Sequence, residues 1–153
     1  MSEPQWLNER EARAWRGFAQ MQAQLNAHLH RTLLRDTGLS LPDYEVLVHL
    51  SESPEGRLRS FQLSDALQWE KSRLSHHLKR MQGRGLVTRQ VCTSDGRGAY
   101  IVLTPRGRAA IESAAPVHVE DVRAVIIDLL TDEQLDTLAE VSQAVLAKLS
   151  GDA

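Results

Sequence analysis

The stretch of sequence that decides the fold runs from Ser60 to Leu103 and reads SFQLSDALQWEKSRLSHHLKRMQGRGLVTRQVCTSDGRGAYIVL. Its first half predicts two short helices, because apolar residues recur there at helical spacing. The two apolar faces consist of Leu63, Ala66 and Leu67, and of Leu74, Leu78 and Met81. Only residues 68–70 separate the two helices, a length that fits the tight corner of a helix–turn–helix.

Two strand-like runs follow the second helix, which Gly83 and Gly85 are expected to end. These runs are Leu86–Cys92 and Ala99–Leu103, and the glycine-containing segment between them has the length of a hairpin loop. Helix, turn, helix and hairpin in this order predict a mainly α (α+β) fold. We interpret it as a winged helix–turn–helix with a two-stranded wing.

The second helix has one face without apolar residues. If its leucines and methionine point into the core, the opposite face carries hydroxyls and cations but no carboxylate. This face consists of Ser72, Ser75, His76 and Lys79, with Arg73 and Arg80 at its edges. It suits a helix that enters the major groove of DNA, where side chains contact base edges and phosphates. The other interpretation is an ordinary solvated face, which the ordered turn and wing signals disfavour.

The charge distribution supports a nucleic-acid partner, although the formal net charge is only −2. Residues 57–108 hold 11 Lys and Arg against Asp65, Glu70 and Asp95, a local charge of +8. The rest of the chain therefore carries −10. A basic middle between acidic ends is typical of a DNA-binding module on a separate scaffold.

Length and composition bound the remaining possibilities. The chain has 153 residues, which suits one domain with a sizeable core. The N-terminus is too polar for a signal peptide, and no segment reaches the length of a membrane span. The single cysteine, Cys92, excludes an intramolecular disulfide and fits a reducing cytoplasm.

On the N-terminal side, one long helix is predicted from about Gln5 to Arg35, with Gly38 as its left-handed stop. A second helix opens at Ser40, which forms a capping-box-like pair with Asp43. Residues 57–59 then lead into the motif.

On the C-terminal side, Thr104 and Pro105 start a helix that should continue to about Leu130. Pro116 lies inside it and should bend or interrupt it. Residues 131–134 are a further capping-box pattern that opens the last helix. The apolar stripes of the terminal helices exceed what one winged-helix unit can cover, so a second apolar layer is expected. A second chain would supply it, and the alternative is packing of three helices within one chain.

These residues resemble the MarR-type transcriptional regulators over nearly the whole chain. The resemblance rests on GLSLPDYEVLVHL, on LSDALQWEKSRLSHHLKRMQGRGLV and on SDGRGAYIVLTPRGR. Its most specific part is the wing tip Asp95-Gly96-Arg97 followed by Leu103-Thr104 and Gly107. It implies one domain over 1–153, with a DNA-binding lobe at 38–106 and dimerisation helices at 1–37 and 107–153.

The resemblance also implies a cytoplasmic homodimer that binds a pseudo-palindromic operator. It implies a repressor released by a small, phenolic effector, with no membrane partner. Ligand-pocket candidates are Trp15, Tyr44 and His49. The predicted DNA-binding residues are Lys71, Ser72, Arg73, Ser75, His76, Lys79, Arg80, Arg89, Asp95 and Arg97.

Catalytic and cofactor motifs are absent from the sequence, so neither an enzyme nor a bound cofactor is predicted. The six histidines lack metal-ligand spacing, and His49 and His118 are the positions to examine for a structural or regulatory metal. Some members of the resembled family sense peroxides through a cysteine in the first helix, which this chain lacks. We interpret Cys92 as a small apolar strand residue.

Two other classes of protein remain open. One is an architectural DNA-binding protein with low sequence preference, which would bind scrambled duplex nearly as well as its own upstream region. The other is a winged-helix module that binds proteins instead of DNA. The basic middle of the chain argues against the second.

Overall fold

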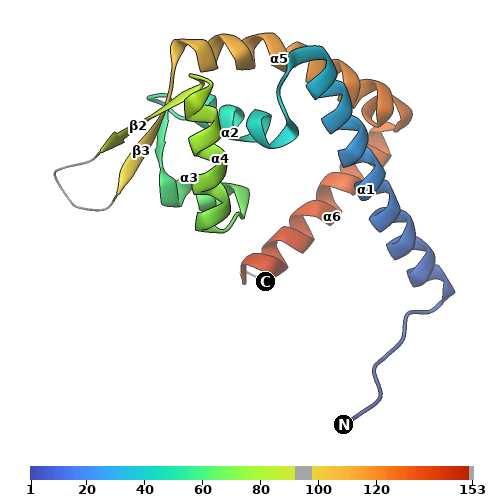
Figure 1. The fold of residues 1–153 in the computed structure, drawn as a ribbon. Coiled ribbons are helices and arrows are strands. Elements are labelled where there is room, and N and C mark those ends of the chain that lie inside the picture. Colours follow the sequence, from blue (N-terminus) through green and yellow to red (C-terminus); the bar gives the residue numbers. More distant parts are fainter. Residues whose placement is uncertain (92–97, 152–153) are drawn as a thin grey trace. The chain divides into compact units, whose positions relative to one another are not determined.

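The computed structural model describes residues 1–91 and 98–151 of the chain (Figure 1). Two compact units are present, Met1–His118 and Val119–Ala153, and we describe each by itself. The first unit holds most of the elements and the division falls within α5. The helices are α1 (Glu9–Thr37), α2 (Leu41–Glu52), α3 (Ser60–Leu67), α4 (Lys71–Gly83), α5 (Pro105–Val125) and α6 (Asp132–Ser150). The strands are β1 (Arg57–Arg59), β2 (Val87–Val91) and β3 (Ala99–Leu103).

Side-chain capping hydrogen bonds mark the starts of α1, α2 and α6. The predicted boxes are confirmed at Ser40 with Asp43, and at Thr131 with Gln134. A third box was missed: Asn8 accepts a hydrogen bond from the Glu11 amide at 2.8 Å, and Glu11 accepts from the Asn8 amide at 2.9 Å. Since this box fixes the start of α1, the predicted start at Gln5 is wrong. At the other end of α1, Gly38 has the predicted left-handed conformation, with φ of 76°.

The sheet has three antiparallel strands in the order β1-β3-β2, so the prediction of a two-stranded wing is incomplete. Strands β2 and β3 pair as predicted, from Val87 opposite Leu103 to Val91 opposite Ala99. The additional strand, β1, places Arg57 opposite Val102 and Arg59 opposite Tyr100. Three residues are too short for an alternating pattern to be recognised in the sequence.

The core of the first unit joins α1, α2, α3, α4 and the sheet. Leu74, Leu78 and Met81 are buried as the helical spacing predicts. The prediction for α3 is partly wrong, because Leu63 is buried and Leu67 half-buried while Ala66 is exposed. The fully buried side chains are Leu33, Val46, Leu47, Leu50, Leu63, Met81, Val87 and Ile101.

Helix α5 is helical on both sides of Pro116, so the predicted interruption does not occur. It ends at Val125 instead of Leu130, and a short 3-10 turn follows at Ile127–Leu129. Across residues 1–91 and 98–151, none of the helices has both the length and the apolarity of a membrane span.

The start of α5 packs unusually close to the turn between α4 and β2. Thr104 is the N-terminal anchor: its Oγ1 accepts a hydrogen bond from the Gly107 amide at 2.9 Å and donates to the Gly85 carbonyl at 2.6 Å. A Cβ on Gly107 would lie 2.1 Å from the Leu86 carbonyl oxygen, which is backbone and cannot move aside cheaply. The absence of a side chain at Gly107 therefore allows the start of α5 to pack directly against the backbone of Leu86, just before β2.

We predict that Gly107→Ala destabilises the protein by about 1–3 kcal/mol, the usual range for overpacking a close contact. Gly17→Ala is the matched control, since Gly17 lies in exposed helix α1 with nothing within 4 Å of a Cβ. The control should stabilise by roughly 0.5–1 kcal/mol, because alanine is the better helix former. Urea unfolding followed by circular dichroism measures both, and equal midpoints for Gly107→Ala and wild type would contradict the close approach.

Candidate nucleic-acid interface

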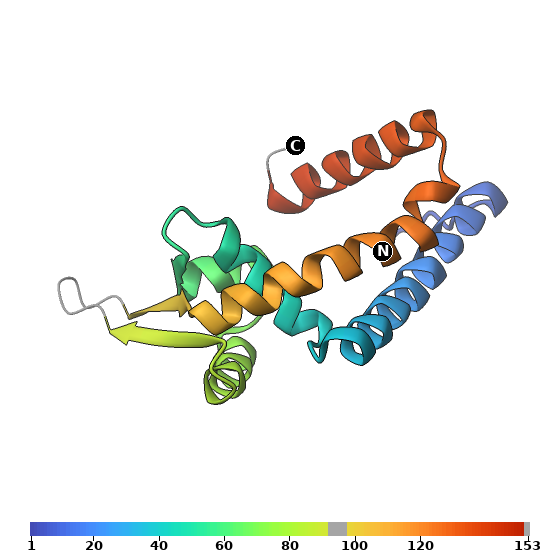
Figure 2. The same ribbon diagram turned by 90° about the horizontal axis from the view of Figure 1, so that it is seen from above.

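Helix α4 lies beside strands β2 and β3 (Figure 2). Its polar face is exposed to solvent. Its apolar side is buried against the core. The opposite side carries short hydroxyls and cations, as the sequence predicts. The exposed residues of this helix include all seven predicted members, Lys71, Ser72, Arg73, Ser75, His76, Lys79 and Arg80.

The corner before α4 is built by local hydrogen bonds. Gln68 adopts the left-handed conformation, with φ of 56°, and its side chain donates to the Asp65 carbonyl at 2.6 Å. Ser64 Oγ donates to the Trp69 carbonyl at 2.6 Å. Glu70 occupies the N-cap without a side-chain hydrogen bond to the helix, and the first turn has no acidic residue.

Two grooves flank α4, and Arg89 of β2 lines both. The groove toward α3 has a volume of 260 Å³ and is also lined by Lys71 and Ser75. The groove toward the wing has a volume of 360 Å³ and is also lined by Ser75 and Lys79. The structure thus brings a predicted cation of the wing strand together with predicted residues of the helix.

Arg73 is exposed, but it is not a freely solvated side chain. Its guanidinium carbon lies 4.2 Å from the centre of the Trp69 ring, in cation–π geometry. Trp69 is itself buried, at 9% exposure. The ring of His77 meets Trp69 edge-on, with centroids 5.4 Å apart and an interplanar angle of 84°.

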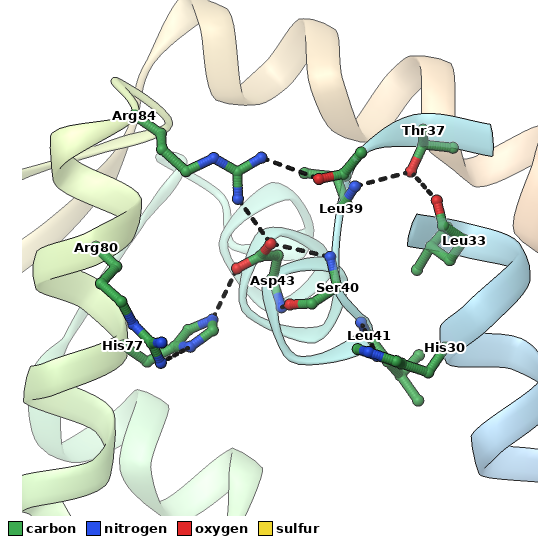
Figure 3. A network of polar contacts seen from close by, with 11 residues as sticks. His30, Leu33, Thr37, Leu39, Ser40, Leu41, Asp43, His77, Arg80 and Arg84 are labelled. Atoms are coloured by element: carbon green, nitrogen blue, oxygen red, sulfur yellow. Dashed lines mark hydrogen bonds and ion pairs between the residues drawn. The ribbon is translucent and has the colours of Figure 1, made fainter. Parts of the chain in front are cut away.

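A polar network lies behind this stack and connects α4 with the corner between α1 and α2 (Figure 3). Asp43 Oδ1 lies 2.9 Å from Nε2 of His77, and Asp43 Oδ2 accepts from Arg84 Nη1 at 2.9 Å and from the Ser40 amide at 3.0 Å. Arg84 Nη2 donates to the Gly38 carbonyl at 3.1 Å. Asp43 therefore contacts the start of α2, the middle of α4 and the turn after α4.

The ionisation of Asp43 follows from these contacts. Burial by itself would raise the pKa of this carboxyl. The hydrogen bonds from His77, from the Ser40 amide and from Arg84 outweigh burial and hold the pKa well below its ordinary value of 3.8. Asp43 is thus a buried anion at neutral pH.

Sequence reasoning missed most of this network. It identified Asp43 as a capping partner of Ser40, but it gave no role to Trp69, His77 or Arg84. The available signal was the position of His77, three residues after Leu74 and four before Met81, which puts it beside the apolar face. Arg80 was predicted to face DNA, and its Nη2 lies 3.4 Å from His77 Nδ1.

Other predicted residues lie elsewhere or outside the described part of the chain. Asp95, Arg97 and Cys92 fall within residues 92–97, which the structure does not describe. The ligand-pocket candidates do not line the grooves beside α4. Trp15 contacts Phe18, with ring centroids 6.1 Å apart, and Tyr44 contacts His118, with centroids 4.5 Å apart. His49 is half-buried on α2.

A metal site was not predicted, and His49 and His118 were the positions to examine. Among residues 1–91 and 98–151, the structure contains no group of three or more His, Cys, Asp or Glu side chains arranged to hold a metal ion. His118 is engaged with the Tyr44 ring.

A helix–turn–helix backed by a three-stranded sheet, with a cationic outer helix face, defines a winged helix–turn–helix protein. A model of the MarR family matches residues 37–98. AbsC from Streptomyces coelicolor, a MarR family transcriptional regulator, is 40% identical, and the match covers 97% of this chain and 99% of AbsC with a TM-score of 0.92.

Two further relatives are also transcriptional regulators. Sco3205, a MarR family transcriptional regulator from Streptomyces coelicolor solved in complex with DNA, is 39% identical; the match covers 95% of this chain and 92% of Sco3205, with a TM-score of 0.92. The transcriptional regulator HosA from Escherichia coli O157:H7 is 28% identical over 134 residues, 88% of this chain and 91% of HosA. The chain belongs to the MarR family of transcriptional regulators, and these relatives are regulators, not enzymes.

We predict that Asp43 makes the protein sensitive to acid. Because its pKa is lower in the folded than in the unfolded chain, its contribution is present above about pH 3.8 and is lost as pH falls below that value. Asp43→Asn should lower the free energy of unfolding at neutral pH by about 1–3 kcal/mol, because the Arg84 guanidinium keeps only a neutral acceptor. It should also flatten the fall in stability toward acid.

Asp36→Asn is the control for this prediction. Asp36 pairs with Arg35 at 2.8 Å on the surface, and the hydrogen bond from Arg35 lowers its pKa too. Because solvent screens this exposed pair, its removal should change the pH profile less than Asp43→Asn does. Urea unfolding at a series of pH values measures all three proteins. A parallel pH dependence for Asp43→Asn and wild type would contradict the role of the buried carboxylate.

Proposed function

We propose that this protein is a dimeric, sequence-specific repressor that inserts α4 into the major groove of a pseudo-palindromic operator. The observation that carries the proposal is the outer face of α4, which is exposed, rich in hydroxyls and cations, and without a carboxylate. Arg89 in the adjoining grooves and the local charge of +8 over residues 57–108 support it. Sco3205, at 39% identity, was solved with DNA, which supports the same partner here.

The proposed surface divides into two kinds of contact. The N-terminal half of the outer face would contact base edges, and the cations around it would neutralise phosphates. The wing tip, Asp95 and Arg97, would enter the adjacent minor groove, a part of the proposal that rests on sequence alone. Base contacts are assigned to Ser72, Arg73, Ser75 and His76, and phosphate contacts to Lys71, Lys79, Arg80 and Arg89.

The proposed dimer uses the terminal segments, 1–37 and 107–153, with residues 38–106 as the DNA-binding lobe. On α1, Trp15 is 60% and Phe18 46% exposed. On α6, Val145 is 51% and Leu149 78% exposed. Apolar side chains at helical spacing on two terminal helices favour a two-fold interface between identical chains.

We further propose that a small phenolic ligand releases the operator, with Trp15, Tyr44 and His49 as pocket candidates. The support is the family resemblance together with the aromatic character of these positions. Tyr44 is half-buried, and burial, followed by the charge of Glu52, raises its pKa, so its hydroxyl remains a neutral donor at neutral pH.

The first test is a footprint on DNA flanking the gene, followed by titration of the protected duplex and of a scrambled duplex. Arg73→Ala should weaken binding to the operator by roughly 1–3 kcal/mol and weaken binding to scrambled DNA less, because it removes a bidentate contact to guanine. Lys79→Ala is the matched contrast: it should weaken both duplexes equally and reduce the salt slope by about 0.9 for each subunit.

These measurements also discriminate the rival classes. Equal affinity of the wild-type protein for both duplexes would identify an architectural DNA-binding protein instead of a regulator. Salt-insensitive or undetectable DNA binding would favour a protein-interaction module. Repeating the footprint with a panel of phenolic acids tests effector release, and protection that no acid alters would contradict it.

The dimer is tested by light scattering on the full chain. Val145→Asp should raise the dimer dissociation constant at least about tenfold, because it puts a charge into an apolar contact. Gln143→Asp, exposed on the same helix but away from the stripe, is the control and should leave the mass unchanged. A stable, folded wild-type monomer at micromolar concentration would overturn the proposed assembly.

A further inference from the structure

Trp69, Arg73 and His77 form a ladder on one side of α4. Trp69 lies in the corner that precedes the helix, because α4 begins at Lys71 after the N-cap Glu70, whereas Arg73 and His77 lie one turn apart on the helix itself. Trp69 is the buried member, and its ring receives Arg73 on one side and the edge of His77 on another. This ladder runs along the flank between the core face and the outer face of the helix, where side chains can reach either.

The stack orients Arg73 without occupying its hydrogen-bond donors. A guanidinium contacts an aromatic ring through its flat face, while its five N–H groups point outward in its plane. Bidentate recognition of guanine uses that in-plane edge. An Arg73 held on Trp69 therefore keeps its donors for a base and has already given up part of the rotamer freedom that binding would otherwise cost.

His77 is fixed by a contact on the side of α4 that faces the core. His77 Nε2 lies 2.9 Å from Asp43 Oδ1, and Asp43 is fixed by the Ser40 amide and by Arg84. Nη2 of Arg80 lies 3.4 Å from Nδ1 of His77. Because a guanidinium can only donate, this contact favours the tautomer of His77 in which Nδ1 is the acceptor. His77 therefore cannot rotate without breaking the contact with a buried carboxylate, and this restricts the space in which the Trp69 ring can move.

We infer that Trp69, His77 and Asp43 are positioning residues for base reading by Arg73, so that discrimination between DNA sequences depends on buried side chains that do not themselves touch DNA. This inference rests on the proposed function, in which α4 reads the operator through Arg73. A structural role alone would lower stability without changing the ratio of affinities for preferred and scrambled duplex.

The experiment uses the full-length protein, a duplex selected by wild type from a random-sequence library, and a scrambled duplex of the same composition. Trp69→Leu should lower the affinity ratio roughly 2- to 12-fold, the factor that corresponds to ordering one long side chain on binding. Trp69→Phe keeps a ring and should keep most of the ratio. His77→Leu, which removes the link to Asp43, should lower the ratio in the same direction.

Two comparisons separate positioning from stability. Val46→Ala removes core volume on α2, at a residue that is fully buried, and should lower the melting temperature while leaving the ratio unchanged. In a double-mutant cycle, Trp69→Leu should have no effect on the ratio once Arg73→Ala is present, because the side chain that it positions is gone.

The outcomes are distinguishable. If Arg73→Ala lowers the ratio but Trp69→Phe, Trp69→Leu and His77→Leu all preserve it, the positioning role is overturned and base reading by Arg73 stands. If Arg73→Ala itself preserves the ratio, the proposed reading and the inference both fail. If Trp69→Leu lowers the ratio equally with and without Arg73, Trp69 acts by another route and the inference is wrong. Should Trp69→Leu not fold, His77→Leu, measured with and without Arg73→Ala, still decides between these outcomes.

Discussion

The buried carboxylate of Asp43 is the constraint on which the helix–turn–helix depends. It is the one charged side chain that is buried among the residues the structure describes, and a buried anion is tolerated only when hydrogen-bond donors surround it. The donors are Ser40 at the N-cap of α2, His77 within α4 and Arg84 at the C-cap of α4. Satisfying one carboxylate therefore fixes the position of α4 against α2.

The same network includes the end of α1. A helix leaves its last carbonyls without partners, and Arg84 donates to one of them, the Gly38 carbonyl, at 3.1 Å. His30 of α1 accepts a hydrogen bond from the Leu41 amide at the start of α2, at 3.2 Å. The helix with the exposed aromatic stripe and the helix with the cationic face are thus connected by polar contacts. A displacement of the α1 terminus would strain Arg84 and, through it, Asp43.

Local patterns predicted much of this arrangement. The spacing of Leu74, Leu78 and Met81 predicted both the core face of α4 and the exposed face opposite, and the boxes at Ser40 and Thr131 predicted helix starts. What sequence could not predict is the link from Asp43 to Arg84, which joins residues 41 positions apart. Periodicity and capping describe neighbours in the chain, whereas a shared buried carboxylate depends on how helices pack. The strand β1 was missed for the same reason, because only its pairing with β3 defines it.

Two adjacent histidines show how α4 contributes both to the core contacts and to the exposed outer face. An α-helix turns by about 100° for each residue, so His76 and His77 point to different surfaces although the sequence gives them the same chemistry. His76 is exposed on the outer face, while the His77 side chain is 12% exposed and contacts Asp43. Arg73 and Arg80 lie on the His77 side of α4, where one stacks on Trp69 and the other approaches the imidazole. The cations at the edges of the outer face therefore contact Trp69 and His77, and His77 in turn contacts the buried carboxylate of Asp43.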